Sequence, residues 1–182
     1  ENGAVVSSNS SYTFNVNDNR TLVANFTATN YTITTSSNPA AGGNTSGGGQ
    51  KACGSSCTVT ATANPCYQFT NWTENGAVVS TNPFYTFNVT ANRNLVANFT
   101  AKNYDVIIQP LPLSGGSTNG GGQKACGSNV EFCAVPAPCY QFTNWTENGS
   151  VVSSLVCFTS IINANRNLTA NFKYVGCVGI DE

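Results

Sequence analysis

The feature that most constrains this chain is an internal repeat with a period of 73 residues. The string CYQFTNWTENG stands at residues 66–76 and returns unchanged at 139–149. The string NRxLxANF stands in the same register at 19–26, 92–99 and 165–172. The units of a solenoid are shorter and cannot fold alone, whereas a unit of this length can form a small domain. We therefore expect tandem small domains rather than one continuous core.

The register of the repeat divides the chain into four parts. Residues 28–100 and 101–173 are two full modules, residues 1–27 match the C-terminal half of a module, and residues 174–182 form a tail. The half module begins at a predicted hairpin turn and lacks the strands that precede this turn in a full module. Because a piece of two or three strands is marginal in water, we expect the missing strands to come from a longer array or from a neighbouring molecule by β-augmentation.

Within a module the pattern is that of short strands. In CTVTATA (57–63) the threonines alternate with apolar or small residues, as in a half-buried strand, and YTFNV (85–89) and LVANF (95–99) repeat the alternation. Asn75-Gly76 is a strong hairpin signal, because type I′ turns need a positive φ at both central positions. No segment has a convincing helical period. The sequence predicts a mostly β protein of tandem small antiparallel β modules, each with five or so strands.

The composition excludes several classes of function. Only 8% of the residues are charged and the net charge is -1, so no long-range field attracts nucleic acid or an anionic membrane. No apolar run approaches the roughly 20 residues that cross a bilayer. We expect no nucleic-acid partner and no membrane insertion. The hydrophobic content of 40% is sufficient for packed cores, which argues against disorder.

Eight cysteines without a histidine favour disulfides over zinc sites, and therefore an oxidising, extracellular compartment. The repeat favours one bridge per module, Cys53–Cys66 and its counterpart Cys126–Cys139. A Cys53–Cys57 bridge is a rival, because the strand between Cys57 and Cys66 advances about 20 Å, whereas a disulfide needs Cα atoms within about 7 Å.

The remaining cysteines do not recur at the equivalent position of the other module. Cys133 and Cys157 occur only in the second module and are candidates for a bridge there. Cys57 and Cys177 are left over in this scheme, and a bond from one of them to a neighbouring subunit is an open alternative. A catalytic thiol is not expected, because the chain has no histidine to activate one.

No set of residues indicates a reaction, a cofactor or a metal site. The glycine-rich string AGGNTSGGGQK (41–51) lacks the spacing of a phosphate-binding loop before Lys51, and no Ser or Thr follows the lysine. We interpret it as a surface loop, and Lys124 as its copy by duplication. The acidic residues show no calcium-binding spacing, and no pair of carboxylates can be nominated for glycoside hydrolysis. We expect a protein that is not an enzyme.

The aromatic residues and the asparagines supply the other candidates. We interpret Trp72, Trp145, Phe99 and Phe172 as core anchors, with a sugar-binding surface around the two tryptophans as the alternative. Asn-x-Ser/Thr acceptors are abundant, and glycans on them would increase solubility and protect strand edges. The glycosylation candidates are Asn9, Asn19, Asn25, Asn30, Asn44, Asn71, Asn88, Asn98, Asn144, Asn148 and Asn167.

The order of these motifs resembles the divergent internalin B-repeat modules of bacterial surface proteins, also called Listeria-Bacteroides repeats. The resemblance covers nearly the whole chain, and the cysteines and the tail YVGCVGIDE depart from it. It implies a small β-grasp-like module that is secreted, arrayed in tandem on large surface proteins and without catalytic activity. The residues that carry it are Tyr67, Phe69, Trp72, Asn75, Gly76, Leu95, Ala97 and Phe99, with equivalents at Tyr140, Phe142, Trp145, Leu168, Ala170 and Phe172.

Together these features predict an extracellular structural repeat protein that forms a surface stalk, fibre or filament. Its expected partners are copies of itself or flanking repeats of the same chain, and a sharper version has subunits that polymerise by β-strand complementation. The alternative is an adhesin or carbohydrate-binding module of a large secreted surface protein, which binds surface glycans.

Overall fold

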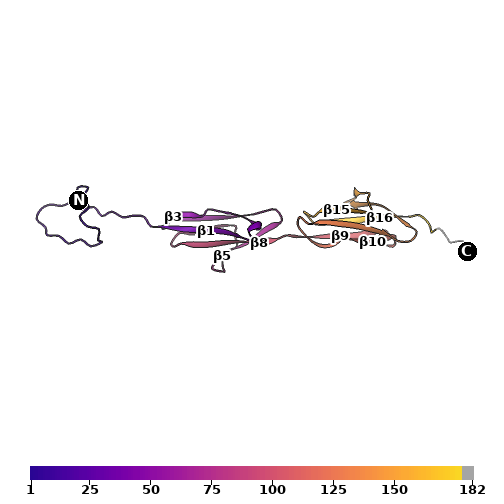
Figure 1. The fold of residues 1–182 in the computed structure, drawn as a ribbon, viewed down its shortest axis with the longest axis horizontal. Coiled ribbons are helices and arrows are strands. Elements are labelled where there is room, and N and C mark those ends of the chain that lie inside the picture. Colours follow the sequence, from indigo (N-terminus) through magenta and orange to yellow (C-terminus); the bar gives the residue numbers. More distant parts are fainter. Residues whose placement is uncertain (178–182) are drawn as a thin grey trace.

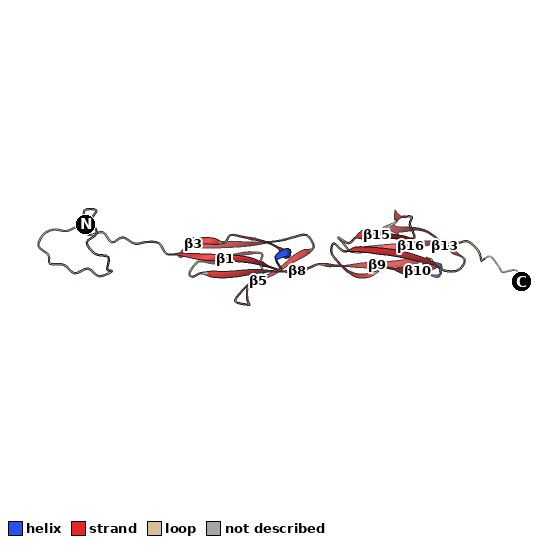
Figure 2. Cartoon of the chain, in the orientation of Figure 1, coloured by secondary structure: helices blue, strands red, loops and turns tan. Residues whose placement is uncertain are grey.

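The computed structural model describes residues 1–177. Within them, two modules of eight strands each lie end to end in an elongated molecule, with the N-terminal segment at one end and residues 174–177 at the other (Figure 1). The described residues contain no α-helix, only the 3-10 turns Ala40–Gly42 and Leu113–Gly115 (Figure 2). Accordingly, none of the described residues forms a helix that is long and apolar enough to span a membrane.

The strands recur in the same order in both modules. The first module contains β1 (Asn30–Asn38), β2 (Gly43–Ser46), β3 (Gly49–Ala52), β4 (Ser56–Ala63), β5 (Tyr67–Glu74), β6 (Ala77–Ser80), β7 (Phe84–Asn88) and β8 (Arg93–Ala101). The second contains β9 (Asn103–Leu111), β10 (Gly116–Asn119), β11 (Gly122–Ala125), β12 (Asn129–Pro136), β13 (Tyr140–Glu147), β14 (Ser150–Ser153), β15 (Cys157–Ile161) and β16 (Arg166–Tyr174).

Each module is built from two small sheets. In the first module a five-stranded sheet has the order β3-β1-β8-β5-β6 and a three-stranded sheet the order β2-β4-β7, and the second module repeats both. Within residues 30–101, β1 and β8 are the one parallel pair; the other pairs are antiparallel. Counted in chain order, the five strands follow the sequence 2-1-5-3-4. The predicted fold class of tandem β modules is confirmed, with eight strands in each module rather than the five or so expected. One parallel pair lies at the centre of each large sheet.

The apolar faces of the two sheets enclose a separate core in each module. Trp72 and Leu95 from the large sheet and Val59 from the small sheet are fully buried in the first module. The indole Nε1 of Trp72 donates a hydrogen bond to the carbonyl oxygen of Pro83 at 3.2 Å, so this buried polar atom is satisfied. In the second module Trp145 and its neighbours form the equivalent cluster.

The hairpin predicted at Asn75-Gly76 is confirmed. The two residues have φ angles of 50° and 82° and connect the antiparallel strands β5 and β6. Asn148-Gly149 repeats the turn, with φ angles of 49° and 81°. Asn2-Gly3 has the same angles, 50° and 84°, and the turn there is closed by a hydrogen bond from the Ala4 N–H to the Glu1 carbonyl.

Residues 1–29 contain no strand, although residues 1–27 carry the sequence of the last strands of a module. Phe26 is 92% exposed, whereas its equivalent Phe99 is 6% exposed; Val16 is 81% exposed, whereas Val89 is fully buried. In the full modules these side chains are covered by strands that have no counterpart in residues 1–27. The segment therefore carries apolar side chains that are buried in a full module, but it lacks the strands that would cover them.

Candidate functional site: the junction between the modules

A single residue, Lys102, connects the two modules. Strand β8 ends at Ala101 and β9 begins at Asn103. The backbone N–H of Lys102 donates a hydrogen bond to the carbonyl of Cys66 at 2.7 Å, and its carbonyl accepts one from the N–H of Cys126 at 3.0 Å. The connecting residue is thus hydrogen-bonded to both modules, which restricts the rotation that a free linker would allow.

A disulfide joins the same two cysteines across the junction. Cys66 lies between β4 and β5 of the first module with a φ of 68°, and Cys126 directly follows β11 of the second. Their Cα atoms are 5.2 Å apart, within the range of disulfide geometry. The modules are therefore covalently connected at two places, through the peptide bonds of Lys102 and through the Cys66–Cys126 bridge.

This bridge corrects the expected pairing within modules. The Cys53–Cys66 and Cys126–Cys139 bridges are not formed, because β4 or β12 runs between the two cysteines and carries them to opposite ends of the module. At about 3.3 Å per residue, a strand of this length spans more than 20 Å. The rival Cys53–Cys57 bridge is not formed either: both are free thiols, with Cys53 exposed and Cys57 buried in the core.

The other two bridges lie in and after the second module. The predicted Cys133–Cys157 bridge is confirmed; the two residues are cross-strand partners on β12 and β15, with Cα atoms 4.1 Å apart. The Glu131 carboxylate lies beside this pair, but sulfurs joined in a disulfide offer no thiolate for a metal ion. Cys139 bonds to Cys177 in the tail, a residue to which the sequence assigned no partner.

Residues 175–177 occupy the position that a following module would take. Cys139 has a φ of 69°, like Cys66, and its carbonyl accepts a hydrogen bond from the Val175 N–H at 2.9 Å. This bond is the equivalent of the one that Lys102 donates at the junction. We call Cys66 and Cys139, each of which lies directly before the fifth strand of its module (β5 or β13), the turn cysteines. Each turn cysteine bonds to the segment that follows its module: Cys66 to the second module and Cys139 to the tail.

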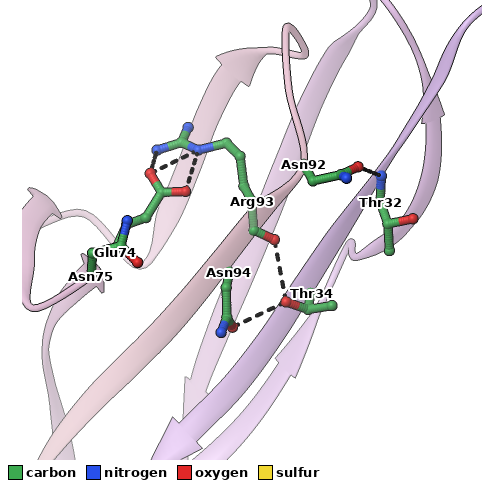
Figure 3. A pocket seen from close by; sticks show the side chains of 7 residues that line it. All are labelled: Thr32, Thr34, Glu74, Asn75, Asn92, Arg93 and Asn94. Atoms are coloured by element: carbon green, nitrogen blue, oxygen red, sulfur yellow. Dashed lines mark hydrogen bonds and ion pairs between the residues drawn. The ribbon is translucent and has the colours of Figure 1, made fainter.

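An ion pair on the large sheet borders a hollow lined by polar residues (Figure 3). The Arg93 guanidinium donates to both carboxylate oxygens of Glu74, at 3.1 Å from Nε to Oε1 and 2.5 Å from Nη2 to Oε2. It also lies over the ring of Phe87, 4.3 Å from the centroid. The hydrogen bonds from Arg93 hold the pKa of Glu74 below its ordinary value.

Two further hydrogen bonds join polar groups that line this hollow. The Thr32 N–H donates to Asn92 Oδ1 at 2.8 Å, and the Thr34 hydroxyl donates to Asn94 Oδ1 at 3.0 Å. Among the residues that the structure describes, Glu74 and Arg93 are the only charged groups that line the hollow, and they neutralise each other. We therefore assign the hollow a structural role, the anchoring of the hairpin turn to β8.

The ion pair was missed by sequence reasoning, although it recurs once per repeat. Glu147 and Arg166 form it in the second module, and Glu1 and Arg20 form it in the N-terminal segment. The available signal is the constant separation of 19 residues between the Glu of each ENG and the following Arg.

The aromatic candidates lie in the cores. Trp72 and Trp145 have no exposed surface, and Phe99 and Phe172 are buried beside them. A sugar needs an exposed ring to stack on, so the tryptophans do not supply a sugar-binding surface. Lys51 and Lys124 lie on the short strands β3 and β11, which shows that part of the glycine-rich string is a strand rather than a loop.

The glycosylation candidates fall into two groups. The side-chain amide of Asn98 donates hydrogen bonds to Asn71 Oδ1 at 2.8 Å and to Thr73 Oγ1 at 3.1 Å, so a glycan on Asn98 would require both to be lost. Asn71 and Asn144 are likewise half-buried. The other candidates are exposed: Asn9, Asn19, Asn25, Asn30, Asn44, Asn88, Asn148 and Asn167.

Comparison with known proteins identifies both modules. A family described as the divergent InlB B-repeat domain matches residues 33–103 and 108–176, which together make up more than half of the chain. The matched regions correspond to the two strand-containing units on either side of the junction. No curated protein and no solved structure matches the chain.

Proposed function

Because the chain belongs to the divergent InlB B-repeat family, whose tandem modules are typical of bacterial surface proteins, we propose that it is an extracellular structural protein that forms part of a surface stalk, fibre or filament. The observation that carries this proposal is the double connection at the junction. The peptide at Lys102 and the Cys66–Cys126 bridge run in parallel, so two covalent paths share any pull along the molecule.

The arrangement of the cores supports the same function. Each module encloses its own hydrophobic cluster, so the length of an array grows with the number of modules without a change in the fold. Disulfides persist in oxidising compartments, which agrees with a position outside the cell. The surface carries few charges and many neutral amides and hydroxyls, and such a surface has little to attract charged partners.

The exposed apolar residues of the N-terminal segment support a partner that is itself a repeat module, either in the same chain or in another copy. Phe26 and Leu22 are 92% and 44% exposed, whereas their equivalents Phe99 and Leu95 are buried. Strands equivalent to β1, β4 and β5 would cover them, and both full modules of this chain contain such strands. Flanking repeats of the same chain or copies of the protein would supply these strands, in the second case by β-strand complementation between subunits.

Small-angle X-ray scattering tests whether the junction is rigid. We expect the oxidised chain to scatter as an extended rod, and Cys66→Ser/Cys126→Ser to broaden the distance distribution because the modules then pivot about Lys102. The matched control is Cys133→Ser/Cys157→Ser, which opens a bridge inside the second module and should leave the distribution unchanged. Equal interdomain flexibility with and without the Cys66–Cys126 bridge would contradict a stiff stalk.

Strand complementation between subunits has a separate test. Sedimentation over a range of concentrations should show association of the full chain, and removal of residues 1–27 should abolish it. A chain that remains monomeric at high concentration excludes complementation between copies and leaves flanking repeats as the source of the missing strands.

A further inference from the structure

We propose that Cys53 is one half of a second disulfide between modules. Its partner is the turn cysteine, equivalent to Cys66 and Cys139, of a module directly before β1. Residues 1–27 correspond to the last strands of that module. The inference rests on the proposed stacking of modules and adds to it the covalent connection on the N-terminal side of the first module.

The backbone around Cys53 repeats the backbone around Cys126. Gly54 has a φ of 78° and Gly127 a φ of 79°. The Gly54 N–H donates to the Val89 carbonyl at 2.7 Å, and the Gly127 N–H donates to the equivalent Ile162 carbonyl at the same distance. The turn that holds Cys126 against its partner is therefore already formed at Cys53, where the thiol is exposed.

One of the two junction hydrogen bonds also has an equivalent at Cys53. The Thr29 carbonyl accepts the Cys53 N–H at 2.8 Å, as the Lys102 carbonyl accepts the Cys126 N–H at 3.0 Å. Lys102 in turn donates its own N–H to the Cys66 carbonyl. The corresponding N–H of Thr29 has no backbone acceptor within residues 1–177. Thr29 and Cys53 thus form the part of a junction that belongs to the downstream module, and the complementary group is the carbonyl of a turn cysteine.

The described cysteines do not provide this partner. Cys66 and Cys139 are of the required kind, but they are bonded to Cys126 and Cys177. The other free thiol, Cys57, is 3% exposed in the core. In both full modules the turn cysteine stands eight residues before the Glu of ENG. In the module that ends with residues 1–27, it would stand eight residues before Glu1.

The bond forms by two exchange steps with a low-molecular-weight disulfide donor. The thiolate of Cys53 or of the turn cysteine attacks the donor, which forms a mixed disulfide and releases one thiol. The second cysteine then attacks the mixed disulfide, forms the bond between modules and releases the second thiol. Two cysteine thiols are oxidised and the donor disulfide is reduced to two thiols, so protons and electrons balance.

The test is a chain extended by a copy of residues 28–73 placed before Glu1, with the copied equivalents of Cys53 and Cys57 changed to Ser and Val. After oxidation by oxidised glutathione, we expect mass spectrometry of non-reduced peptides to find Cys53 linked to the copied Pro-Cys-Tyr segment. The number of thiols that react rapidly with a thiol reagent should fall from two, Cys53 and the copied turn cysteine, to zero. The matched control carries the same copy in scrambled order and should keep both reactive thiols.

A folded third module with Cys53 still a free thiol would overturn the proposal, and the fluorescence of the added tryptophan reports whether that module has folded. If the extension does not fold, peptide mapping of the protein from its native source decides. A link from Cys53 to a Pro-Cys-Tyr type peptide supports the proposal, and intact mass distinguishes the same chain from another copy. An alkylatable Cys53, or a link to any other cysteine, overturns it. These measurements do not depend on the rigidity of the Lys102 junction. The proposal of a stiff stalk and the proposal of a Cys53 bridge can therefore be refuted independently.

Discussion

The bridge between Cys66 and Cys126 should contribute several kcal/mol to the stability of the modules. A disulfide restricts the unfolded chain, and its effect grows with the logarithm of the closed loop. The separation of 60 residues corresponds to a contribution of about 4 kcal/mol near room temperature. If only the first module unfolds, the free part of the loop runs from Cys66 to Lys102, and the logarithmic dependence changes the value little. We expect Cys66→Ser/Cys126→Ser to lower the free energy of unfolding of the first module by roughly 3 to 4 kcal/mol.

Tryptophan fluorescence measures the two modules separately, because each described module buries one tryptophan. Trp145→Phe leaves Trp72 as the reporter of the first module, and Trp72→Phe leaves Trp145 as the reporter of the second. Urea unfolding of each single-tryptophan chain, with and without the two serine substitutions, gives the loss of stability in each module. Both midpoints should fall, since the closed loop includes strands of both modules.

The control is Cys133→Ser/Cys157→Ser, which opens a loop of 24 residues inside the second module. The same relation gives a loss of about 3.5 kcal/mol, confined to the transition that Trp145 reports. The reasoning is refuted if opening the Cys66–Cys126 bridge moves neither midpoint. It is also refuted if the control destabilises the first module as strongly as the second.

Three further substitutions test the packing and the ion pair by urea unfolding. Gly42→Ala should destabilise the first module by about 1 to 3 kcal/mol, because its Cβ would lie 2.6 Å from the Cβ of Phe99; an unchanged midpoint would contradict this contact. Arg93→Gln should cost roughly 1 kcal/mol at neutral pH, since the pair with Glu74 is partly exposed. Because the pKa of folded Glu74 lies below its ordinary 4.5, the contribution of the pair is complete above that pH and is lost as the pH falls through the lowered value. The stability curves of wild type and variant should therefore converge in acid, and a constant difference would exclude the ion pair as the cause. Cys57→Val should cost less than about 1.5 kcal/mol, because the second module has a valine at this position; a larger loss would mean that the thiol does more than fill space.

Strands were predictable where side chains alternate for long enough. The segment 57–63 lies within β4, and the segment 95–99 lies within β8, because one face of each strand is buried and the other is wet. The strands β2 and β3 contain only four residues each, too few for alternation to stand out from a sequence rich in Gly, Ser and Thr. The equally short β6 was predictable only from the Asn75-Gly76 turn that precedes it. The parallel pairing of β1 with β8 was not predictable either, since it joins the two ends of a module and depends on the packing of both sheets.

The cysteines were identified by the sequence, but most of their partners were not. In a tandem repeat, two recurring cysteine positions can bond within each module or across each junction. Both pairings have the same period, so the repeat alone does not distinguish them. The tail contained the deciding signal. Pairing within modules leaves Cys177 without a partner, whereas pairing across junctions assigns it to Cys139, because the tail follows the second module as the second follows the first. The same rule leaves Cys53 as the free thiol on the N-terminal side. A bond pattern shifted by one module therefore explains the bridges at both ends of the second module, and it makes the oxidation state of Cys53 a direct report on whether another module is bound before β1.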